Sequence, residues 1–403
     1  MKLFCFHHAG GSALMYKSLK INGIQICPIQ LNCRDENKKP FYKSLIEASN
    51  EIYCEMIKLI DENDELYMVF AHSMESWIAY SVLSKMMQND RKMPIKFIVS
   101  AFCHPFINAA DSPWISNTKL NDNDFKEILE WGANSKLLLE PYWSIFKDRL
   151  RADFSLFDVN PIIDIVKLNC KIMVVLPSED NRIKEHMVLG WRDITDNFEL
   201  VKIKGNHFYL LENKNVINNF IHIKALCLHG HLTNANIMRL QMIEYIKQMP
   251  FVDFHMINAP TIKNTTYPEV KMFFSSETNY YEWFNCNKEN LELNGLDKSL
   301  ELLEPIIKDY DVLIGFSQGA SMVSILASKM NVNKVILICH GKYVSDININ
   351  SKSLHLIDSK DEYMSCGINA LNKYNDKQII YFEDGHKIPN DKINIEIIMR
   401  FIC

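Results

Sequence analysis

One segment constrains the fold of this chain more than any other, an apolar run that ends in a G-x-S-x-G motif, Val312-Leu-Ile-Gly-Phe-Ser-Gln-Gly-Ala320. The residues after it, up to about Met330, have the pattern of a helix. A sharp turn from a strand into a helix strains the serine at its tip, and the residues two before and two after must be small because backbone approaches backbone there. Gly315 and Gly319 occupy these positions. The segment therefore predicts a nucleophile elbow with Ser317 at its tip, rather than a structural glycine-rich turn.

Apolar strands alternate with helical segments twice along the chain. We expect strands at residues 3–6, 24–31, 66–71, 96–101, 170–176 and 198–203, and again at 223–228, 252–258, 312–316, 334–339 and 354–357. The pattern restarts near residue 222 with almost no linker. Such alternation predicts mostly parallel sheets covered by helices on both faces, in two domains, residues 1–221 and 222–403.

Each half of the chain has a serine, an acid and a histidine in the order typical of α/β-hydrolase domains. They are Ser73, Asp180 and His207 in the first half, and Ser317, Asp361 and His386 in the second. The acid precedes the histidine by 27 residues in the first half and by 25 in the second. A histidine can take the serine proton, a carboxylate can orient the imidazole, and backbone N–H groups can stabilise an oxyanion. Two tandem α/β-hydrolase domains are expected, with Glu179 and Asp358 as alternative acids.

The first half has an additional segment between its serine and its acid. This interval is 107 residues in the first half and 44 in the second, and the additional 63 residues coincide with a tryptophan-rich segment at about 111–153. Trp114, Trp131 and Trp143 lie there among charges at helical spacing. We expect a helical lid over the first active site, and the alternative is an ordinary packed helical insert.

Composition limits the partners. The formal net charge of -5 and the absence of a basic stripe argue against nucleic acid or an anionic membrane surface. Eleven scattered cysteines without a C-x-x-C pair predict neither a disulfide framework nor a metal site, and suit a reducing cytoplasm. No apolar run approaches the length of a membrane span, so a soluble protein is expected. We also expect no cofactor.

The first half resembles the type II thioesterases that accompany fatty-acid, polyketide and non-ribosomal peptide synthases. The resemblance covers about residues 1–221 and rests on Phe4-Cys-Phe-His-His-Ala-Gly-Gly-Ser-Ala13, Ile29-Gln-Leu31, His72-Ser-Met74 with Ala79-Tyr80, and Gly205-Asn-His-Phe208. It implies a triad of Ser73, Asp180 and His207. It also implies that the amides of Ala9 and Met74 form the oxyanion hole.

The second half resembles the FSH-type serine hydrolases. The matching segments are Leu226-Cys-Leu-His-Gly230 with Asn234, Gly315-Phe-Ser-Gln-Gly-Ala320, and Gly385-His386 with Pro389. This resemblance implies a triad of Ser317, Asp361 and His386. The implied oxyanion donors are the amides of His231 and Gln318.

Two residues of the first half depart from the thioesterase pattern. The elbow of that family is usually G-H-S-M-G, whereas this chain has Ala71-His-Ser-Met-Glu75, and His7 stands where the family usually has proline. A glutamate at a position of close backbone approach is expected to strain the elbow, or to place its charge beside the site and raise the pKa of His207. A third expectation is that Glu75 serves the reaction directly.

Together, the resemblances imply a tandem serine hydrolase. Its first domain would release acyl groups from acyl carrier protein or CoA thioesters through an acyl-serine intermediate, and its second would be an esterase or thioesterase. The alternative is that the first domain only binds acyl carrier, as a weakly active or inactive module, and that only the second domain is catalytic.

Overall fold

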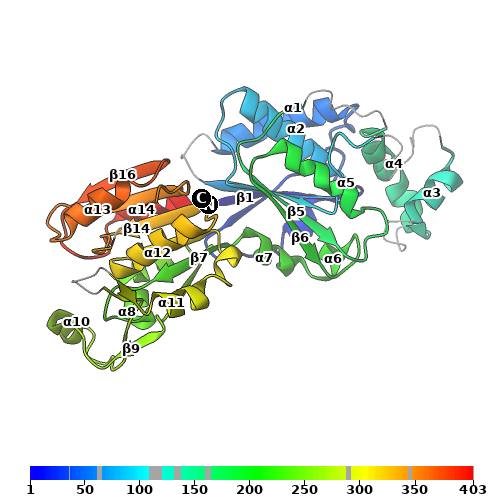
Figure 1. Ribbon diagram of the computed structural model, residues 1–403. Coiled ribbons are helices and arrows are strands. Elements are labelled where there is room, and N and C mark those ends of the chain that lie inside the picture. The colour runs from blue at the N-terminus through cyan, green and yellow to red at the C-terminus, as the bar shows by residue number, and fades with distance from the viewer. Residues whose placement is uncertain are drawn as a thin grey trace. The chain divides into compact units, whose positions relative to one another are not determined.

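The computed structural model describes residues 1–35, 37–60, 66–108, 120–130, 138–158, 165–286, 292–343 and 347–402. The chain forms two compact units, Met1–Ile221 and His222–Cys403 (Figure 1). Each unit has its own sheet of six strands and its own apolar core. None of the described helices is long and apolar enough to cross a bilayer.

The sheet of the first unit is entirely parallel. Its strands are β1 (Lys2–Phe6), β2 (Gln25–Pro28), β3 (Tyr67–His72), β4 (Lys96–Ser100), β5 (Lys171–Pro177) and β6 (Phe198–Ile203), in the spatial order β2-β1-β3-β4-β5-β6. The central strands β1, β3 and β4 are buried along their whole length, which explains their continuous apolar sequences. Strand β2 lies at the edge, the usual place for a strand that contains proline.

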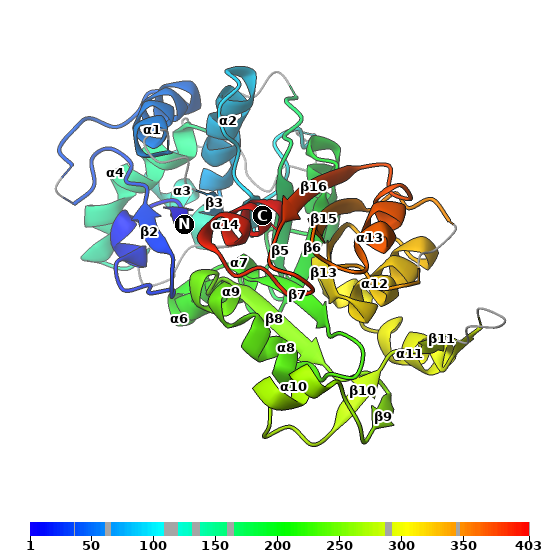
Figure 2. The ribbon, with the colours of Figure 1, turned by 90° about the vertical axis from the view of Figure 1, so that its left-hand side faces the viewer.

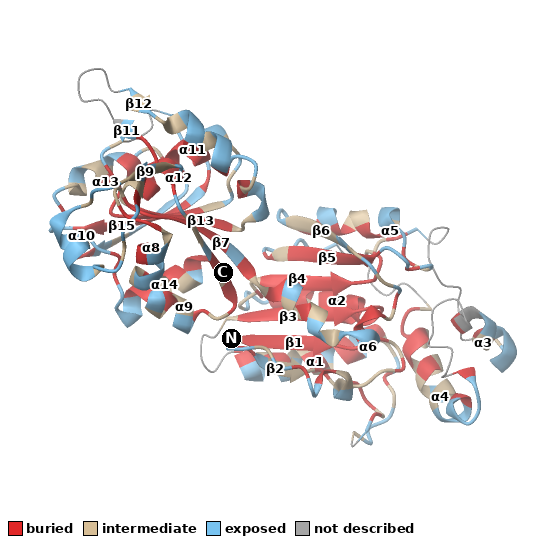
Figure 3. Cartoon of the chain, turned by 90° about the horizontal axis from the view of Figure 1, so that it is seen from below, coloured by how far each residue is buried: buried red, intermediate tan, exposed pale blue. Residues whose placement is uncertain are grey.

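Helices cover both faces of this sheet. The α-helices are α1 (Leu45–Ile60), α2 (Glu75–Gln88), α3 (Asp122–Glu130), α4 (Tyr142–Ser155), α5 (Glu185–Leu189), α6 (Tyr209–Glu212) and α7 (Asn218–Ile221), with 3-10 turns at Ala13–Tyr16, Gly190–Ile194 and Lys214–Ile217. Helices α1 and α2 lie on one face and α7 on the other (Figure 1). Helices α3 and α4 lie beyond the carboxyl ends of the strands (Figure 3).

The second unit repeats this arrangement. Its parallel strands are β7 (Ile223–Leu228), β8 (Val252–Ile257), β13 (Val312–Phe316), β14 (Lys334–Ile338), β15 (Lys352–Asp358) and β16 (Lys377–Phe382), in the order β8-β7-β13-β14-β15-β16. Two small antiparallel ribbons are formed by β9 (Thr261–Lys263) with β10 (Tyr280–Glu282), and by β11 (Asn285–Cys286) with β12 (Leu293–Asn294).

The helices of the second unit also cover both faces. They are α8 (Ala235–Gln241), α9 (Ile243–Gln248), α10 (Pro268–Phe273), α11 (Leu296–Leu303), α12 (Gln318–Lys329), α13 (Met364–Leu371) and α14 (Lys392–Ile402), with a 3-10 turn at Ile307–Asp309. Helices α8, α9 and α14 lie on one face and α11 and α12 on the other (Figure 2). These two sheets confirm the predicted parallel α/β architecture.

The shared strand order decides where a site can form. In each unit the first strand lies beside the third, and the chain continues outward from this pair in opposite directions. Open parallel sheets hold their sites outside the carboxyl ends of the strands, where the strand order reverses. The loops after the first, third, fifth and sixth strands all open at that end, so residues far apart in sequence meet there.

The 111–153 insert is helical where the structure describes it. It contains α3 and α4, which pack on each other through a small apolar cluster of Phe125, Leu129, Leu138, Trp143, Leu150 and Phe154. Trp114 and Trp131 lie outside the described residues.

Candidate active sites

The first elbow places Ser73 between β3 and α2. Ser73 has a left-handed backbone conformation, with φ of 60°, which a residue with a Cβ adopts only at a cost of about 1–3 kcal/mol. Its amide donates to the carbonyl of Ser100 at the end of β4, at 2.8 Å. The neighbouring strand therefore holds the turn and leaves the serine hydroxyl at the carboxyl end of the sheet.

Three side chains form a continuous hydrogen-bonded row at this point. Ser73 Oγ lies 2.9 Å from His207 Nε2, and His207 Nδ1 lies 2.7 Å from Asp180 Oδ2. The three residues come from the loops after the third, fifth and sixth strands. Glu179, the alternative acid, is exposed to solvent. In this geometry His207 can take the serine proton while Asp180 orients the imidazole.

The environment of Asp180 keeps its carboxylate charged. Burial alone would raise its pKa, but the hydrogen bond with His207 and those from the amides of Ile183 and Arg182 lower the pKa below its ordinary value. The two amides donate to Oδ1 at 3.1 and 2.8 Å. Since Oδ1 is held by backbone, Oδ2 is left to receive the histidine N–H.

The loop after β1 contains Ala9, one of the two residues whose amides are expected to form the oxyanion hole. Within the described part of the chain, no hydrogen bond engages the amides of Ala9 and Met74. Gly10 has a φ of +74°, and the amide of Gly11 donates to the carbonyl of His8 at 2.9 Å, which closes the loop into a tight turn. Both expected donor residues line the cavity that contains Ser73.

A largely apolar cavity adjoins this row. Its apolar wall consists of Ala9, Met74, Phe102, Leu129, Leu150, Phe154, Phe157, Ile183 and Phe208, and its polar lining residues are His8, Ser73, Arg182 and His207. Leu129 comes from α3, and Leu150 and Phe154 come from α4. The 111–153 insert thus forms part of the wall next to the serine. Such a lining suits an apolar ligand.

Glu75 does not line the cavity. Its side chain is 0% exposed at the first residue of α2, and Oε1 lies 2.6 Å from Nδ1 of His7, which is equally buried. His7 Nδ1 also lies 2.9 Å from the carbonyl oxygen of His8. Burial raises the pKa of Glu75 well above its ordinary value, and burial together with Arg34 lowers the pKa of His7 to about 3. Both shifts favour the uncharged form of each group.

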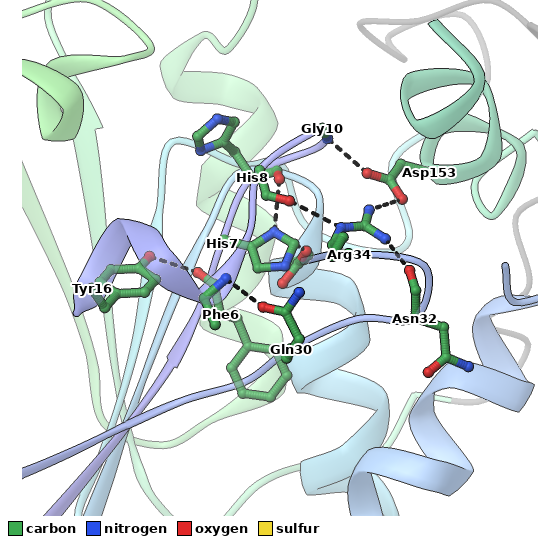
Figure 4. Close-up of polar contacts among 12 residues, drawn as sticks. Phe6, His7, His8, Gly10, Tyr16, Gln30, Asn32, Arg34 and Asp153 are labelled. Atoms are coloured by element: carbon green, nitrogen blue, oxygen red, sulfur yellow. Dashed lines mark hydrogen bonds and ion pairs between the residues drawn. The ribbon is translucent and has the colours of Figure 1, made fainter. Parts of the chain in front are cut away.

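An ion pair of Arg34 and Asp153 lies next to this pair (Figure 4). Asp153 comes from α4 and is 2% exposed, and its other oxygen accepts from the amide of Gly10 at 2.7 Å. Arg34 Nε donates to the carbonyl of Gly11 at 2.9 Å. The sequence pattern did not identify Arg34 or Asp153, because each lies in a segment without a motif.

The second elbow shows why its two glycines are needed. Ser317 has a φ of 54°. A Cβ on Gly315 would lie 2.5 Å from backbone atoms of Ala320, and one on Gly319 would lie 2.0 Å from the carbonyl oxygen of Leu228. Real Cβ atoms do not come that close, so both positions require glycine as the motif predicts.

The second acid and histidine also meet. His386 Nδ1 lies 2.7 Å from Asp361 Oδ2. Asp358, the alternative acid, instead accepts the amides of Lys360, Asp384 and Gly385 at 2.6, 2.5 and 2.8 Å, and so organises the loop that carries the histidine. Among the described residues, no hydrogen bond joins Ser317 Oγ to His386, so the second row lacks its last link.

The side chains of Gln318 and His231, the expected oxyanion residues of the second unit, are both held by hydrogen bonds. The side chain of Gln318 accepts from the amide of Trp283 at 2.9 Å and donates to the carbonyl of Phe284 at 2.6 Å. His231 Nδ1 lies 2.7 Å from the hydroxyl of Tyr267, and its Nε2 lies 3.2 Å from Glu282. These side chains fix the backbone, and no described residue engages the amides of His231 and Gln318.

One residue near the second site escaped the sequence analysis. Cys339, directly after β14, has a φ of 45°. Its sulfur lies within 4.8 Å of a carboxylate oxygen of Asp361 and of a ring nitrogen of His386. Burial raises the pKa of its thiol. Its place at the carboxyl end of a central strand was the one available signal.

A comparison with protein families identifies the first unit. The family model described as "Thioesterase domain" matches residues 1–225, more than half of the chain. The chain belongs to the thioesterase-domain family. A second model, described as "Serine hydrolase (FSH1)", matches residues 220–398 of this thioesterase. The protein is therefore a hydrolase of thioester or ester bonds, as the two resemblances predicted.

Individual relatives match the first unit of the thioesterase. The gramicidin S biosynthesis protein GrsT of Aneurinibacillus migulanus is 25% identical over 221 residues, which are 53% of this chain and 84% of that protein. The human S-acyl fatty acid synthase thioesterase, medium chain, is 24% identical over 237 residues, which are 56% of this chain and 87% of that protein.

Solved structures match the same part of the chain. RedJ, a thioesterase of the prodiginine pathway in Streptomyces coelicolor, has 22% identity and a TM-score of 0.47, over 52% of this chain and 84% of RedJ. ClbQ, from the colibactin NRPS/PKS pathway, has 20% identity and a TM-score of 0.48, over 55% of this chain and 94% of ClbQ.

Proposed function

We propose that the first unit hydrolyses acyl thioesters carried by acyl carrier protein or CoA, with Ser73, His207 and Asp180 as its catalytic triad. One observation carries this proposal: the hydrogen-bonded row from Ser73 to Asp180 opens into an apolar cavity. The cavity suits the acyl chain, and the row suits attack on its carbonyl. We also propose that the protein acts in the cytoplasm, because its eleven scattered cysteines suit a reducing environment.

The proposed reaction has two stages. Ser73 Oγ attacks the thioester carbonyl while His207 takes its proton, and the amides of Ala9 and Met74 stabilise the oxyanion. The C–S bond then breaks, and the thiol leaves with the proton from His207. A water molecule, deprotonated by His207, attacks the acyl-Ser73 ester, and the serine regains its proton when the free acid leaves.

The second unit is proposed to be a separate serine hydrolase with Ser317, His386 and Asp361 as its triad. The strained elbow and the 2.7 Å contact between His386 and Asp361 support this assignment. His231 and Gln318 would supply the oxyanion donors. The missing contact between Ser317 and His386 would form when substrate binds, since catalytic hydrogen bonds often tighten only in the complex. Its substrate would be an ester or a thioester.

The test measures hydrolysis of an acyl-carrier-protein thioester and an acyl-CoA by wild type, Ser73→Ala and Ser317→Ala proteins. We expect Ser73→Ala to lose carrier thioester hydrolysis and Ser317→Ala to retain it. Fluorophosphonate labelling followed by peptide mapping reports each activated serine separately. If Ser73→Ala hydrolyses carrier thioesters as well as wild type, the first unit is a carrier-binding module and this proposal is wrong.

A further inference from the structure

Helix α4 contacts two parts of the first site at once. Leu150 and Phe154 lie in the wall of the cavity beside Ser73. Asp153, within the same turn of the helix, accepts from the amide of Gly10 in the loop after β1. That loop carries the amide of Ala9, a proposed oxyanion donor. The cavity for the acyl chain and the loop for the oxyanion therefore share one helix.

The contact made by Asp153 is buried and charged. Oδ2 accepts from the amide of Gly10 at 2.7 Å, and Oδ1 pairs with the guanidinium of Arg34 (Figure 4). Arg34 in turn donates to the carbonyls of Gly11 at 2.9 Å and Asn32 at 2.7 Å. Hydrogen bonds to a charged group are shorter and stronger than neutral ones. The pair thus holds both the N–H of Gly10 and the C=O of Gly11.

Packing restricts the same loop from the side of α4. A Cβ on Gly10 would lie 2.7 Å from a methyl carbon of Leu150, so the helix fits closely on the bare glycine. Ala9 packs against the apolar cluster that α3 and α4 form. At the other end of the loop, His7 contacts Glu75 beneath the elbow. The position of the Ala9 amide is therefore fixed jointly by α4 and by the elbow helix α2.

We propose that Asp153 is a positioning residue that makes assembly of the oxyanion hole depend on the acyl chain. A chain that fills the cavity packs against Leu150 and Phe154 and favours the position of α4 in which Asp153 holds Gly10. A short acyl group leaves that wall empty and does not favour this position. The inference rests on the proposed thioesterase function of the first unit and adds how that site selects its substrate.

The proposal predicts where chain length acts in the kinetics. Binding energy that is used equally in the ground and transition states changes KM alone, whereas energy that assembles the catalytic groups raises kcat. We expect kcat to rise at least tenfold from acetyl-CoA to decanoyl-CoA in a Ser317→Ala background, where the first site acts alone.

The test replaces the pair without leaving a buried charge. The double variant Arg34→Met/Asp153→Leu removes both charges, because removal of one partner alone would strand the other. In this variant kcat for decanoyl-CoA should fall at least tenfold and the dependence of kcat on chain length should be lost, with KM within about threefold of wild type. Asp153→Asn keeps one oxygen acceptor for Gly10 and should retain part of the dependence.

Lys147→Ala is the matched control on α4, since Lys147 contacts only the exposed Asp122 on α3 among the bonds that the structure shows. It should leave both kcat and its dependence unchanged. If the double variant slows all substrates equally and keeps the slope, Asp153 is merely structural and the proposal is overturned. A wild type protein in which chain length changes only KM overturns it as well. If the wild type protein shows no hydrolysis that depends on Ser73, the proposed function itself is refuted.

Discussion

Glu75 and His7, the two residues that depart from the thioesterase pattern, contact each other. Their side chains are both 0% exposed and meet at 2.6 Å. Two of the sequence-based expectations, that Glu75 places its charge beside the triad or serves the reaction by contacting His207, are therefore wrong. The glutamate lies between the elbow helix and the loop after β1, and the raised pKa of Glu75 and the lowered pKa of His7 favour the uncharged form of each group.

This pairing leads to a prediction that separates the charge of Glu75 from its volume. Glu75→Gln keeps the shape of a protonated carboxyl and should retain turnover within about threefold. Glu75→Gly should lower the free energy of unfolding by about 2–4 kcal/mol, because it leaves a cavity beside His7 and places glycine in a helix. Urea unfolding and turnover in a Ser317→Ala background check both. Faster turnover by Glu75→Gly would instead show that the glutamate strains the elbow.

The same pair predicts a pH dependence of stability. The pKa of Glu75 is raised in the folded protein from an ordinary value of 4.5, so above that pH the folded state binds more protons than the unfolded state. The contribution of Glu75 is fully present below pH 4.5 and is lost as the pH rises. The difference in unfolding free energy, wild type minus Glu75→Gln, should therefore fall as the pH rises above 4.5. A difference that rises with pH would mean that Glu75 is ionised.

The two acids of the second unit should behave differently. Asp361 contacts His386, whereas Asp358 accepts three backbone amides. Asp361→Asn should lower Ser317-dependent turnover by about 10³- to 10⁴-fold with little change in stability. Asp358→Asn should lower the unfolding free energy by about 1–3 kcal/mol, since a buried amide side chain cannot accept all three bonds. Ester hydrolysis and thermal unfolding of the two variants decide between them.

At the scale of elements, the second elbow depends on close approach between its helix and β7. Gly319→Ala would place a Cβ 2.0 Å from the carbonyl of Leu228, so we expect a loss of at least about 3 kcal/mol and no fluorophosphonate labelling of Ser317. Gly385→Ala is the matched control, because Gly385 has a φ of +82° but no atom within 4 Å of the added Cβ. It should cost only about 1–2 kcal/mol. Equal losses would show that the close approach to Leu228 costs no more than the strained φ of Gly385 does, and would contradict this account of Gly319.

The elements that the sequence predicted well are those with one dominant pattern. Central strands such as β3 and β13 are buried on both faces, so their apolar runs are unmistakable. Where the sequence pattern is weaker, it indicates the element less accurately. The helical pattern near residues 13–19 forms only a 3-10 turn at Ala13–Tyr16, and the helical pattern at 234–247 is divided at Met242 into α8 and α9. In both places tertiary packing outweighs local propensity.

For the sites, the sequence could indicate the reactive groups but not their supports. Serine, acid and histidine follow strands in a fixed order, so the fold brings them to one edge of a sheet. Arg34 and Asp153 are 119 residues apart, and no local pattern marks a pair at such a distance. The contact between His7 and Glu75 was equally hidden, although each residue was noticed separately.

At the scale of the whole molecule, each unit has a sheet, a core and a site of its own. A fragment of residues 1–221 should therefore fold alone and hydrolyse carrier thioesters within about threefold of the Ser317→Ala full-length protein. Circular dichroism and turnover of this fragment are the measurements. An unfolded or inactive fragment would show that the first unit needs the second.

The left-handed φ of Ser73 and Ser317 has an evolutionary consequence. Glycine adopts this conformation without penalty, so replacement of either nucleophile by glycine should stabilise the protein by about 1 kcal/mol while it abolishes that site. A laboratory selection for abundance or heat resistance would then enrich dead enzymes. A selection that also demands the two proposed hydrolase activities should instead retain both serines.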